Sequence, residues 1–451
     1  MCKKTLLLTV VLSIVLACNS QGEVIHSTWV GGRWGLWEQA SNWDPAAVPD
    51  NDDAMSFSVT VDANEDKCEI QMSEDHTVNR LDVKGRVRFT TPLVWPEPVL
   101  TLLDSNDGLS NHGFLALGPL VINLVGDVRN APGAYLKGFL DTIEGNLLNE
   151  AAGRIDLYDH YLDVSDGNVY NHGILLCTPT GGVWAEHEFL NSGMIENYGG
   201  LCSSDGPFTN ENTGVVRGQG MIHSDQHIIN NGLIQSLGGD LTLHSRVDFE
   251  GPYYPNWGMV NIGTLVNSPG TTLTVMVWVP DVNNQGIIQV NADGSVVFDC
   301  NNLNNEPNGI IKLLGGTLAV TTITQKAGAT LEGFGGIAGD ITVEPNSPSE
   351  PNSIVRLTGP TNIVGDVSIS EGATLEVSDG TTLITGHTTC NGTIHLKGGR
   401  IIPQGGLSGE CNIIWEPGLY TNIADFNLDG KVALADFAYF ADTWLWQTAW
   451  H

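Results

Sequence analysis

A recurring Asn–Gly pattern is the feature that most constrains the fold of this 451-residue chain. Ten times, an Asn is followed within a few residues by a Gly and then by a hydrophobic run. Five successive Gly residues lie 20 positions apart: Gly113, Gly133, Gly153, Gly173 and Gly193. Twenty residues accommodate two or three short strands with their corners, but not a self-sufficient domain. The repeat therefore predicts one turn of a solenoid per copy.

The position two residues after each Gly tests this prediction, because stacked coils place side chains of one kind above each other. All ten residues at this position are apolar: Leu115, Tyr135, Ile155, Leu175, Ile195, Val216, Ile234, Leu265, Ile288 and Ile311. Such a column is typical of parallel strands about 4.8 Å apart that direct aliphatic side chains into a shared interior. The predicted fold class is all-β, a parallel β-solenoid, with a right-handed β-helix as the expected form. A β-sandwich with many Gly turns is the alternative, but it gives no reason for a constant step.

The corners agree with this prediction. The Asn residues that precede the Gly steps are Asn111, Asn130, Asn149, Asn171, Asn191, Asn210, Asn231, Asn261, Asn284 and Asn305. Asn and Gly both tolerate the left-handed backbone of a sharp corner, and stacked Asn side chains can hydrogen-bond along the axis. A second Gly precedes a later strand in several coils, as at Gly315 before Leu318, so each coil carries at least two strands.

Composition and charge narrow the function classes. The chain has 451 residues, which is too many for one compact core, and it is rich in turn residues, with 54 Gly and 20 Pro, and has 16% charged residues. An elongated stack of coils agrees with both its length and its composition. Its 19 basic and 51 acidic residues give a formal charge of −32. This charge argues against nucleic acid, anionic lipid and other polyanionic ligands unless a cation bridges them, and we interpret it as the acidic surface of a soluble exported protein.

The first residues are typical of an export signal. Lys3 and Lys4 precede an apolar run that ends at Ala17, too short to serve as a membrane anchor, so residues 1–17 form a predicted signal peptide. The run ends in Val-Leu-Ala-Cys, which resembles a bacterial lipobox with Cys18 as the lipidated residue, and ordinary signal cleavage is the alternative. We expect an extracellular or cell-surface protein, for which a lipid on Cys18, if it is added, is the one expected contact with the membrane.

Six cysteines remain beyond Cys2 and Cys18, and an even number in an exported chain permits disulfides. Cys390 and Cys411 are 21 residues apart, about one coil, and are the best candidates for a bridge. The cysteines show no CxxC spacing and no nearby pair of histidines, so a zinc site is not expected.

Residues 24–100 differ from the repeats and are predicted to form an N-terminal cap and entry strands ahead of the solenoid repeats at 101–415. Their opening is rich in aromatic and turn residues, including Trp29, Trp34, Trp37 and Trp43. This opening resembles the start of exported bacterial β-helix proteins of the autotransporter passenger type. A solenoid needs its first coil covered, so we interpret these Trp residues as a cap, with a sugar-binding platform as the alternative.

One motif near the C-terminus has a definite chemistry. Asp425, Asn427, Asp429 and Asp436 stand at positions 1, 3, 5 and 12 of a loop with Gly at position 6. These oxygens, together with the backbone carbonyl of Lys431 at position 7, form the ligand set of an EF-hand-like Ca²⁺ loop. The sequence therefore predicts Ca²⁺ as a bound cofactor here.

An amphipathic helix is predicted directly after this loop, with Phe437, Phe440 and Trp444 on one face. A loop with Asp at position 12 followed by an aromatic helix resembles a dockerin repeat of type I, here in a single copy within residues 420–451. The resemblance implies attachment to a cohesin-like or other cell-surface partner. A calcium-stabilised cap or a sorting signal is the alternative role.

The solenoid sequence defines no catalytic residues. Asp156, Asp159, Asp163 and Asp166 fall within one coil and are interpreted as solvent-facing, while the histidines lack metal spacing. Right-handed β-helices include polysaccharide lyases and glycoside hydrolases, so an enzyme of these classes remains the alternative to the structural or adhesive function that we expect. A carbohydrate-binding scaffold is a third candidate and would use exposed Trp184, Trp257 and Trp278.

Overall fold

The computed structural model describes residues 23–52, 55–91, 98–106, 108–118, 121–138, 142–158, 161–246, 258–278, 281–345 and 353–416. It is all-β, with 65% strand, almost no helix and about 15 turns of parallel β-solenoid, which confirms the prediction of an all-β parallel solenoid. The predicted C-terminal helix lies outside the described residues. The chain divides into two compact units, one with residues 23–264 and 276–278 and the other with residues 265–275 and 281–416. No described helix is long and apolar enough to cross a membrane.

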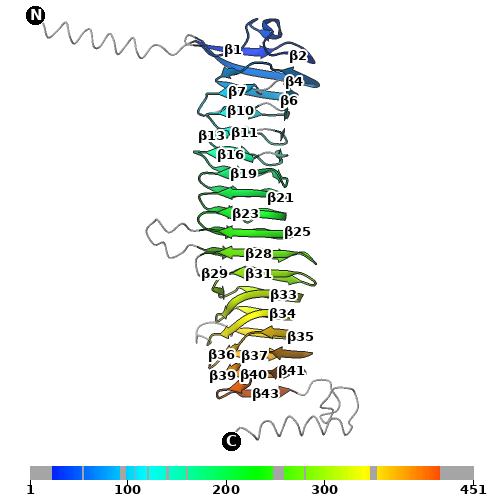
Figure 1. Cartoon of the computed structure of the whole chain (residues 1–451), viewed down its shortest axis with the longest axis vertical. Coiled ribbons are helices and arrows are strands. Elements are labelled where there is room, and N and C mark those ends of the chain that lie inside the picture. The colour runs from blue at the N-terminus through cyan, green and yellow to red at the C-terminus, as the bar shows by residue number, and fades with distance from the viewer. Residues whose placement is uncertain are drawn as a thin grey trace, which may run out of the picture. The chain divides into compact units, whose positions relative to one another are not determined.

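The repeats of the first unit contain three series of parallel strands, and Figure 1 shows them as successive rungs. The first series comprises β8 (Leu109–Asn111), β11 (Val128–Asn130), β14 (Leu147–Asn149), β17 (Val169–Asn171), β20 (Phe189–Asn191), β22 (Phe208–Asn210), β24 (Ile228–Asn230) and β26 (Met259–Asn261). The second series comprises β9 (Phe114–Leu117), β12 (Tyr135–Lys137), β15 (Arg154–Leu157) and β18 (Ile174–Cys177). The third series comprises β7 (Val99–Leu102), β10 (Val121–Leu124), β13 (Thr142–Glu144), β16 (Tyr161–Ser165) and β19 (Gly182–Ala185). In later coils β21 (Met194–Ser204), β23 (Val215–Ser224) and β25 (Leu233–Ser245) each continue both of these series.

The unit begins with β1 (Glu23–Trp29), β2 (Trp34–Leu36), the short 3₁₀ helix η1 (Ala40–Asn42), β3 (Trp43–Asp44), β4 (Met55–Gln71), β5 (His76–Val78) and β6 (Arg80–Thr90). Trp29, Trp37 and Trp43 are buried here, with edge-on ring contacts at centroid distances of 5.0 and 4.7 Å. Trp37 also lies 6.1 Å from the ring of Phe89 on β6. These three residues belong to the core over the first coil and present no platform for sugars, whereas Trp34 is 60% exposed.

A buried ladder of Asn side chains runs along the first unit, as predicted. Each amide nitrogen donates to the carbonyl oxygen of the next side chain at 2.7–2.8 Å, through Asn111, Asn130, Asn149, Asn171, Asn191, Asn210, Asn230 and Asn261. The prediction of Asn231 was wrong, because Asn230 is the inward residue of β24 and pairs in register with Asn210. Asn231 is the next residue along, in the corner.

The interior column also differs from prediction at one position. Leu136, not Tyr135, points inward on β12 and is 2% exposed. The reason lies in the corner: Gly133 occupies the left-handed position (φ 74°) that Ala152 holds in the next coil (φ 62°), whereas Gly153 lies one residue later. The residue two positions after Gly133 is therefore not equivalent to the residue two positions after Gly153. A shift of one residue moves a side chain to the opposite face of a strand.

The second unit repeats the same plan. The points where the chain divides lie within β27 (Thr264–Asn267) and β28 (Thr272–Val277). The strands that follow in the second unit are β29 (Asp281–Asn284), β30 (Ile287–Asn291), β31 (Ser295–Asp299), β32 (Asn302–Asn305), β33 (Ile310–Gln325), β34 (Thr330–Val343), β35 (Ile354–Val364), β36 (Val367–Ile369), β37 (Thr374–Val377), β38 (Thr381–Ile384), β39 (Thr388–Cys390), β40 (Thr393–Lys397), β41 (Arg400–Pro403), β42 (Leu407–Ser408) and β43 (Asn412–Glu416). Asn284, Asn305 and Gln325 form a shorter amide ladder, with hydrogen bonds of 2.7 and 2.9 Å.

A disulfide joins Cys390 and Cys411 across neighbouring coils of the second unit, with a Cα–Cα distance of 4.9 Å, which confirms the predicted pairing. Cys68, Cys177, Cys202 and Cys300 are buried free thiols. The Cys177 and Cys202 sulfurs lie 3.3 Å apart, in contact but not bonded.

Replacing Cys390 and Cys411 together by serine is expected to lower the free energy of unfolding of the second unit. The bridge closes a loop with a sequence separation of 21, for which chain entropy gives a loss of about 3 kcal/mol. Urea unfolding followed by circular dichroism measures the loss. Reductant is the control: it should lower the midpoint of the unsubstituted protein to that of the variant and leave the variant unchanged, and an equal effect on both would contradict the prediction.

Candidate functional site

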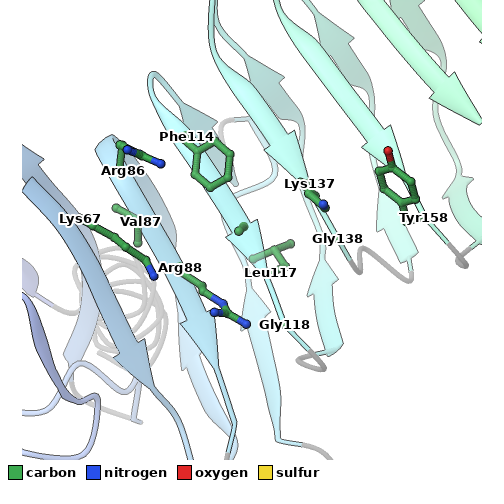
Figure 2. Close-up of a pocket in the computed structure, with 11 residues that line it drawn as sticks. Lys67, Arg86, Val87, Arg88, Phe114, Leu117, Gly118, Lys137, Gly138 and Tyr158 are labelled. Carbon is green, nitrogen blue, oxygen red and sulfur yellow. The ribbon is translucent and has the colours of Figure 1, made fainter.

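A surface pocket of about 520 Å³ lies on the first unit, across strands β4, β6, β9 and β12 (Figure 2). Its lining consists of Lys67, Arg86, Val87, Arg88, Phe114, Ala116, Leu117, Gly118, Lys137, Gly138 and Tyr158. Four of these residues are basic and none is acidic. A chain with a formal charge of −32 therefore concentrates positive charge at this pocket.

Strand register explains how the pocket forms. Lys67, Arg86 and Phe114 are register partners on β4, β6 and β9, so their side chains form one outward row. Arg88, Ala116 and Lys137 form a parallel row on β6, β9 and β12. Because the small Ala116 stands between two long cationic side chains, the middle of this row is hollow. The pocket is thus formed by residues on successive coils that are distant in sequence, from Lys67 to Tyr158.

The cations of the pocket differ in their surroundings. Lys67 lies 3.6 Å from the Glu69 carboxylate. The Arg86 guanidinium lies 5.7 Å from the centre of the Phe114 ring, and the Lys137 ammonium lies 4.7 Å from that of Tyr158.

Arg88 and Lys137 are both exposed. Within the described part of the chain, neither of them pairs with a carboxylate. These two side chains are therefore available to an anionic ligand.

A polar cluster borders the pocket on the next coil. Asp156 is 1% exposed, accepts hydrogen bonds from Arg154 at 2.7 and 3.2 Å, and accepts another from the Tyr135 hydroxyl. The interpretation of Asp156 as solvent-facing was therefore wrong, because its charge is compensated by Arg154 inside the cluster. Burial and the hydrogen bond to Asp156 raise the pKa of Tyr135 to about 12, so this phenol stays protonated at neutral pH.

A second cluster combines carboxylates, imidazoles and an indole on later coils of the first unit. Register places Asp163, Trp184, Ser203, His223 and His244 in one outward column. The Trp184 indole N–H donates to Asp205 at 2.7 Å, and His223 lies 2.9 Å from Asp225 and 3.1 Å from His244.

The carboxylates of this second cluster interact electrostatically. Burial, together with the charges of Glu186 and Asp205, raises the pKa of Asp163. Burial and the charges of Asp225 and Glu186 raise the pKa of Asp205, although its hydrogen bond from Trp184 opposes this. A carboxyl group that keeps its proton more readily than usual can act as a general acid, so this cluster is the candidate for catalysis.

Asp163→Asn is expected to stabilise the first unit at neutral pH. The raised pKa means that ionising Asp163 costs more in the folded chain than in the unfolded chain, where its pKa is about 3.9. The gain in stability is below about 1 kcal/mol, because the charge is partly exposed. It is present at pH values above the pKa of Asp163 in the folded chain and disappears at pH values below the pKa of Asp163 in the unfolded chain. Melting temperatures from pH 3 to 8 measure it. Asp299→Asn, at an exposed position, is the control, and a gain that persists at pH 3 would contradict the prediction.

The structure tests only part of the predicted site residues. Asp425, Asn427, Asp429, Lys431 and Asp436 of the Ca²⁺ loop lie outside the described residues. So do the aromatic helix, the signal peptide with Cys18, Asp159 and Trp257. Among the described residues, no group of three His, Cys, Asp or Glu side chains is arranged to hold a metal ion.

The two other Trp candidates are placed by the structure. Trp184 is half-buried and is held by Asp205, whereas Trp278 is 59% exposed and lies 5.7 Å from the Arg246 guanidinium.

The basic pocket was not predicted from the sequence, where the excess of acidic residues was interpreted as the acidic surface of a soluble protein. Arg80, Lys84, Arg86 and Arg88 fall within nine residues of an acidic chain, and this local excess is a visible signal. The proximity of Lys137 to Arg88 depends on the coil register and needed the structure.

Comparison of the chain with models of known protein families, with curated proteins and with solved structures finds no match in any of the three.

Proposed function

We propose that this chain is an exported adhesive protein whose solenoid is a stiff structural element and whose basic pocket holds an anionic extracellular ligand. The observation that carries the binding role is the lining of the pocket, with four cations and no carboxylate. General acid–base chemistry on a glycan usually needs a pair of carboxyl groups, which this pocket lacks. Ordered apolar columns and amide ladders within each unit support the structural role.

The C-terminal loop is the proposed means of attachment. Asp425, Asn427, Asp429, Lys431 and Asp436 would bind Ca²⁺, and the folded loop and helix would dock onto a cohesin-like or other surface partner. Calorimetric titration of the full chain with Ca²⁺ should show one site that Asp425→Ala abolishes. Asn422→Ala, just before the loop, is the matched control and should bind normally. Equal affinity in the Asp425→Ala variant would end the proposal of a metal site.

The proposed adhesive function is tested by retention. The full chain is passed over immobilised anionic polymers of several kinds, both polysaccharides and polyphosphate, and over neutral polysaccharides. We expect salt-sensitive retention on at least one anionic matrix, and the Arg88→Gln, Lys137→Gln double variant should lose it. Retention that survives this double substitution would show that the pocket is not the adhesive site.

A carbohydrate-active enzyme is the second candidate, and the observation that favours it is the second cluster. Asp163, Glu186, Asp205 and Asp225 come from successive coils. Burial, followed by the charges of its neighbours in this set, raises the pKa of Asp163 and that of Asp205. A glycoside hydrolase needs one protonated and one ionised carboxyl group at a glycosidic bond. Product analysis on a polysaccharide panel tests this function. New reducing ends that Asp205→Asn abolishes would establish hydrolysis, and an unsaturated uronide would indicate a lyase instead.

A further inference from the structure

We infer that the basic pocket is built for a short acidic oligosaccharide of uronic-acid type, which lies across β6, β9 and β12 with its carboxylates on Arg88 and Lys137. This inference rests on the proposed function and names the chemical class of its ligand. Three observations carry it: the spacing of the two cations, the apolar and aromatic walls, and the acidic character of the rest of the chain.

The spacing of the cations matches a ligand with regularly repeated charges. Arg88 and Lys137 share one outward row with Ala116 between them, so they are two strand spacings apart, about 9.6 Å. One sugar ring of an extended polysaccharide is about as long as one strand spacing. Carboxylates two rings apart therefore fall opposite Arg88 and Lys137, while the intervening ring lies over Ala116. The guanidinium can bind its carboxylate through two parallel hydrogen bonds, and the ammonium supplies a point charge.

The walls of the pocket suit a ring with apolar C–H faces. The rings of Phe114, which is partly exposed, and Tyr158, which is 41% exposed, provide apolar surface, whereas Val87 and Leu117 are buried core residues. In Figure 2 the rings of Phe114 and Tyr158 stand on either side of Lys137. A pocket with this mixture of apolar walls and a few convergent charges fits a compact ring better than a bare inorganic anion.

The charge of the whole chain limits how long and how densely charged the ligand is. Duplex DNA carries one charge per about 1.7 Å and would extend from the pocket over a protein with a formal charge of −32. A uronate chain carries only one charge per ring. At physiological ionic strength the screening length is about 8 Å, so a short ligand in the pocket interacts mainly with nearby charges. These are the four cations of the lining and Glu69, which pairs with Lys67 and leaves a local excess of positive charge. The observations therefore favour an acidic oligosaccharide over nucleic acid.

The test is calorimetric titration of the full chain with a hexagalacturonate and with its carboxyl-reduced, neutral form. We expect the acidic form to bind and the reduced form to bind at least about tenfold more weakly. Arg88→Gln and Lys137→Gln should each weaken binding at least about tenfold, as expected for the loss of a charge-assisted hydrogen bond. Ala116→Leu fills the hollow without changing the charge and should also abolish binding.

Lys84→Gln is the matched control. Lys84 is 48% exposed on the same strand as Arg88, pairs with Asp82 at 3.5 Å and does not line the pocket. This variant should keep the affinity of the unsubstituted protein. Circular dichroism melting of all variants checks that they fold, since each substitution is on the outer face of a strand.

Two further probes, inorganic phosphate and a hexathymidylate, separate the ways in which the inference can fail. If either binds through Arg88 and Lys137 while hexagalacturonate does not, the uronate class is wrong but an anion-binding adhesive pocket survives. If none of the anions binds, the inference and the pocket's part in the proposed function both fall. Equal binding of the acidic and reduced oligosaccharides would also overturn the inference, because the cations would then have no role.

Discussion

Trp43→Ala should lower the free energy of unfolding of the first coils by about 3–5 kcal/mol, the range for truncation of a large buried aromatic residue. Trp43 is 2% exposed, and its ring makes T-shaped contacts with the rings of Trp29 and Trp37. Its indole N–H donates to the backbone carbonyl of Trp37 at 2.7 Å. Removing the ring therefore opens a cavity between two aromatic side chains and leaves a buried carbonyl without its donor.

Urea unfolding of the full chain, followed by intrinsic fluorescence and circular dichroism, measures this effect. A solenoid coil contacts mainly its neighbours, so the N-terminal coils of the variant should unfold in an earlier transition. Trp34→Ala is the matched control, because Trp34 belongs to the same segment but is 60% exposed, and its loss should cost no more than about 0.5 kcal/mol. Similar losses in both variants would contradict the view that the Trp cluster is core rather than a binding surface.

The solenoid was predictable because its determinants are periodic. One coil places the same residue types at the same positions, so the pattern of Asn, Gly and apolar residues indicates strand stacking directly. The same reasoning paired Cys390 with Cys411, since residues about one coil apart become neighbours. Spacing along the chain is sufficient for such predictions, because the coil length converts it into a distance.

The errors at single positions have a physical cause in the corners. Gly133 and Gly153 look equivalent in sequence, yet the left-handed residue of the second corner is Ala152, with φ 62°. A non-Gly residue tolerates this conformation when the surrounding strands fix it, so Gly alone does not mark the corner position. Side-chain burial decides the register instead, and it identifies Leu136 and Asn230 as the inward residues.

The candidate site was less predictable than the fold, because its residues share no motif. Arg88 and Lys137 are 49 positions apart and lie in one row only because β6 and β12 both flank β9. The intervening coils differ in length, so no fixed step connects the two residues. His223 and His244, by contrast, are 21 positions apart, and a one-coil step would have brought them together.

Asn191→Leu tests the amide ladder and is expected to cost about 2–6 kcal/mol. Asn191 accepts a hydrogen bond from the side chain of Asn171 at 2.7 Å and donates one to that of Asn210 at 2.8 Å. Leucine fills the space but leaves one N–H and one C=O without a partner in a dry interior, at about 1–3 kcal/mol each. Asn212→Ala is the control, because this Asn is exposed in the following corner and should have little effect.

A double variant separates the ladder from simple packing. Asn191→Leu together with Asn210→Leu removes both the donor and the acceptor of the hydrogen bond between these two side chains. The loss of this bond therefore leaves neither a donor nor an acceptor without its partner. The two substitutions should therefore cost less together than the sum of their separate costs, by about 1–3 kcal/mol in a thermodynamic cycle. Strict additivity in urea unfolding would mean that the stacked amides are not coupled. In that case the apolar columns beside them, rather than the Asn ladder, would hold successive coils in register.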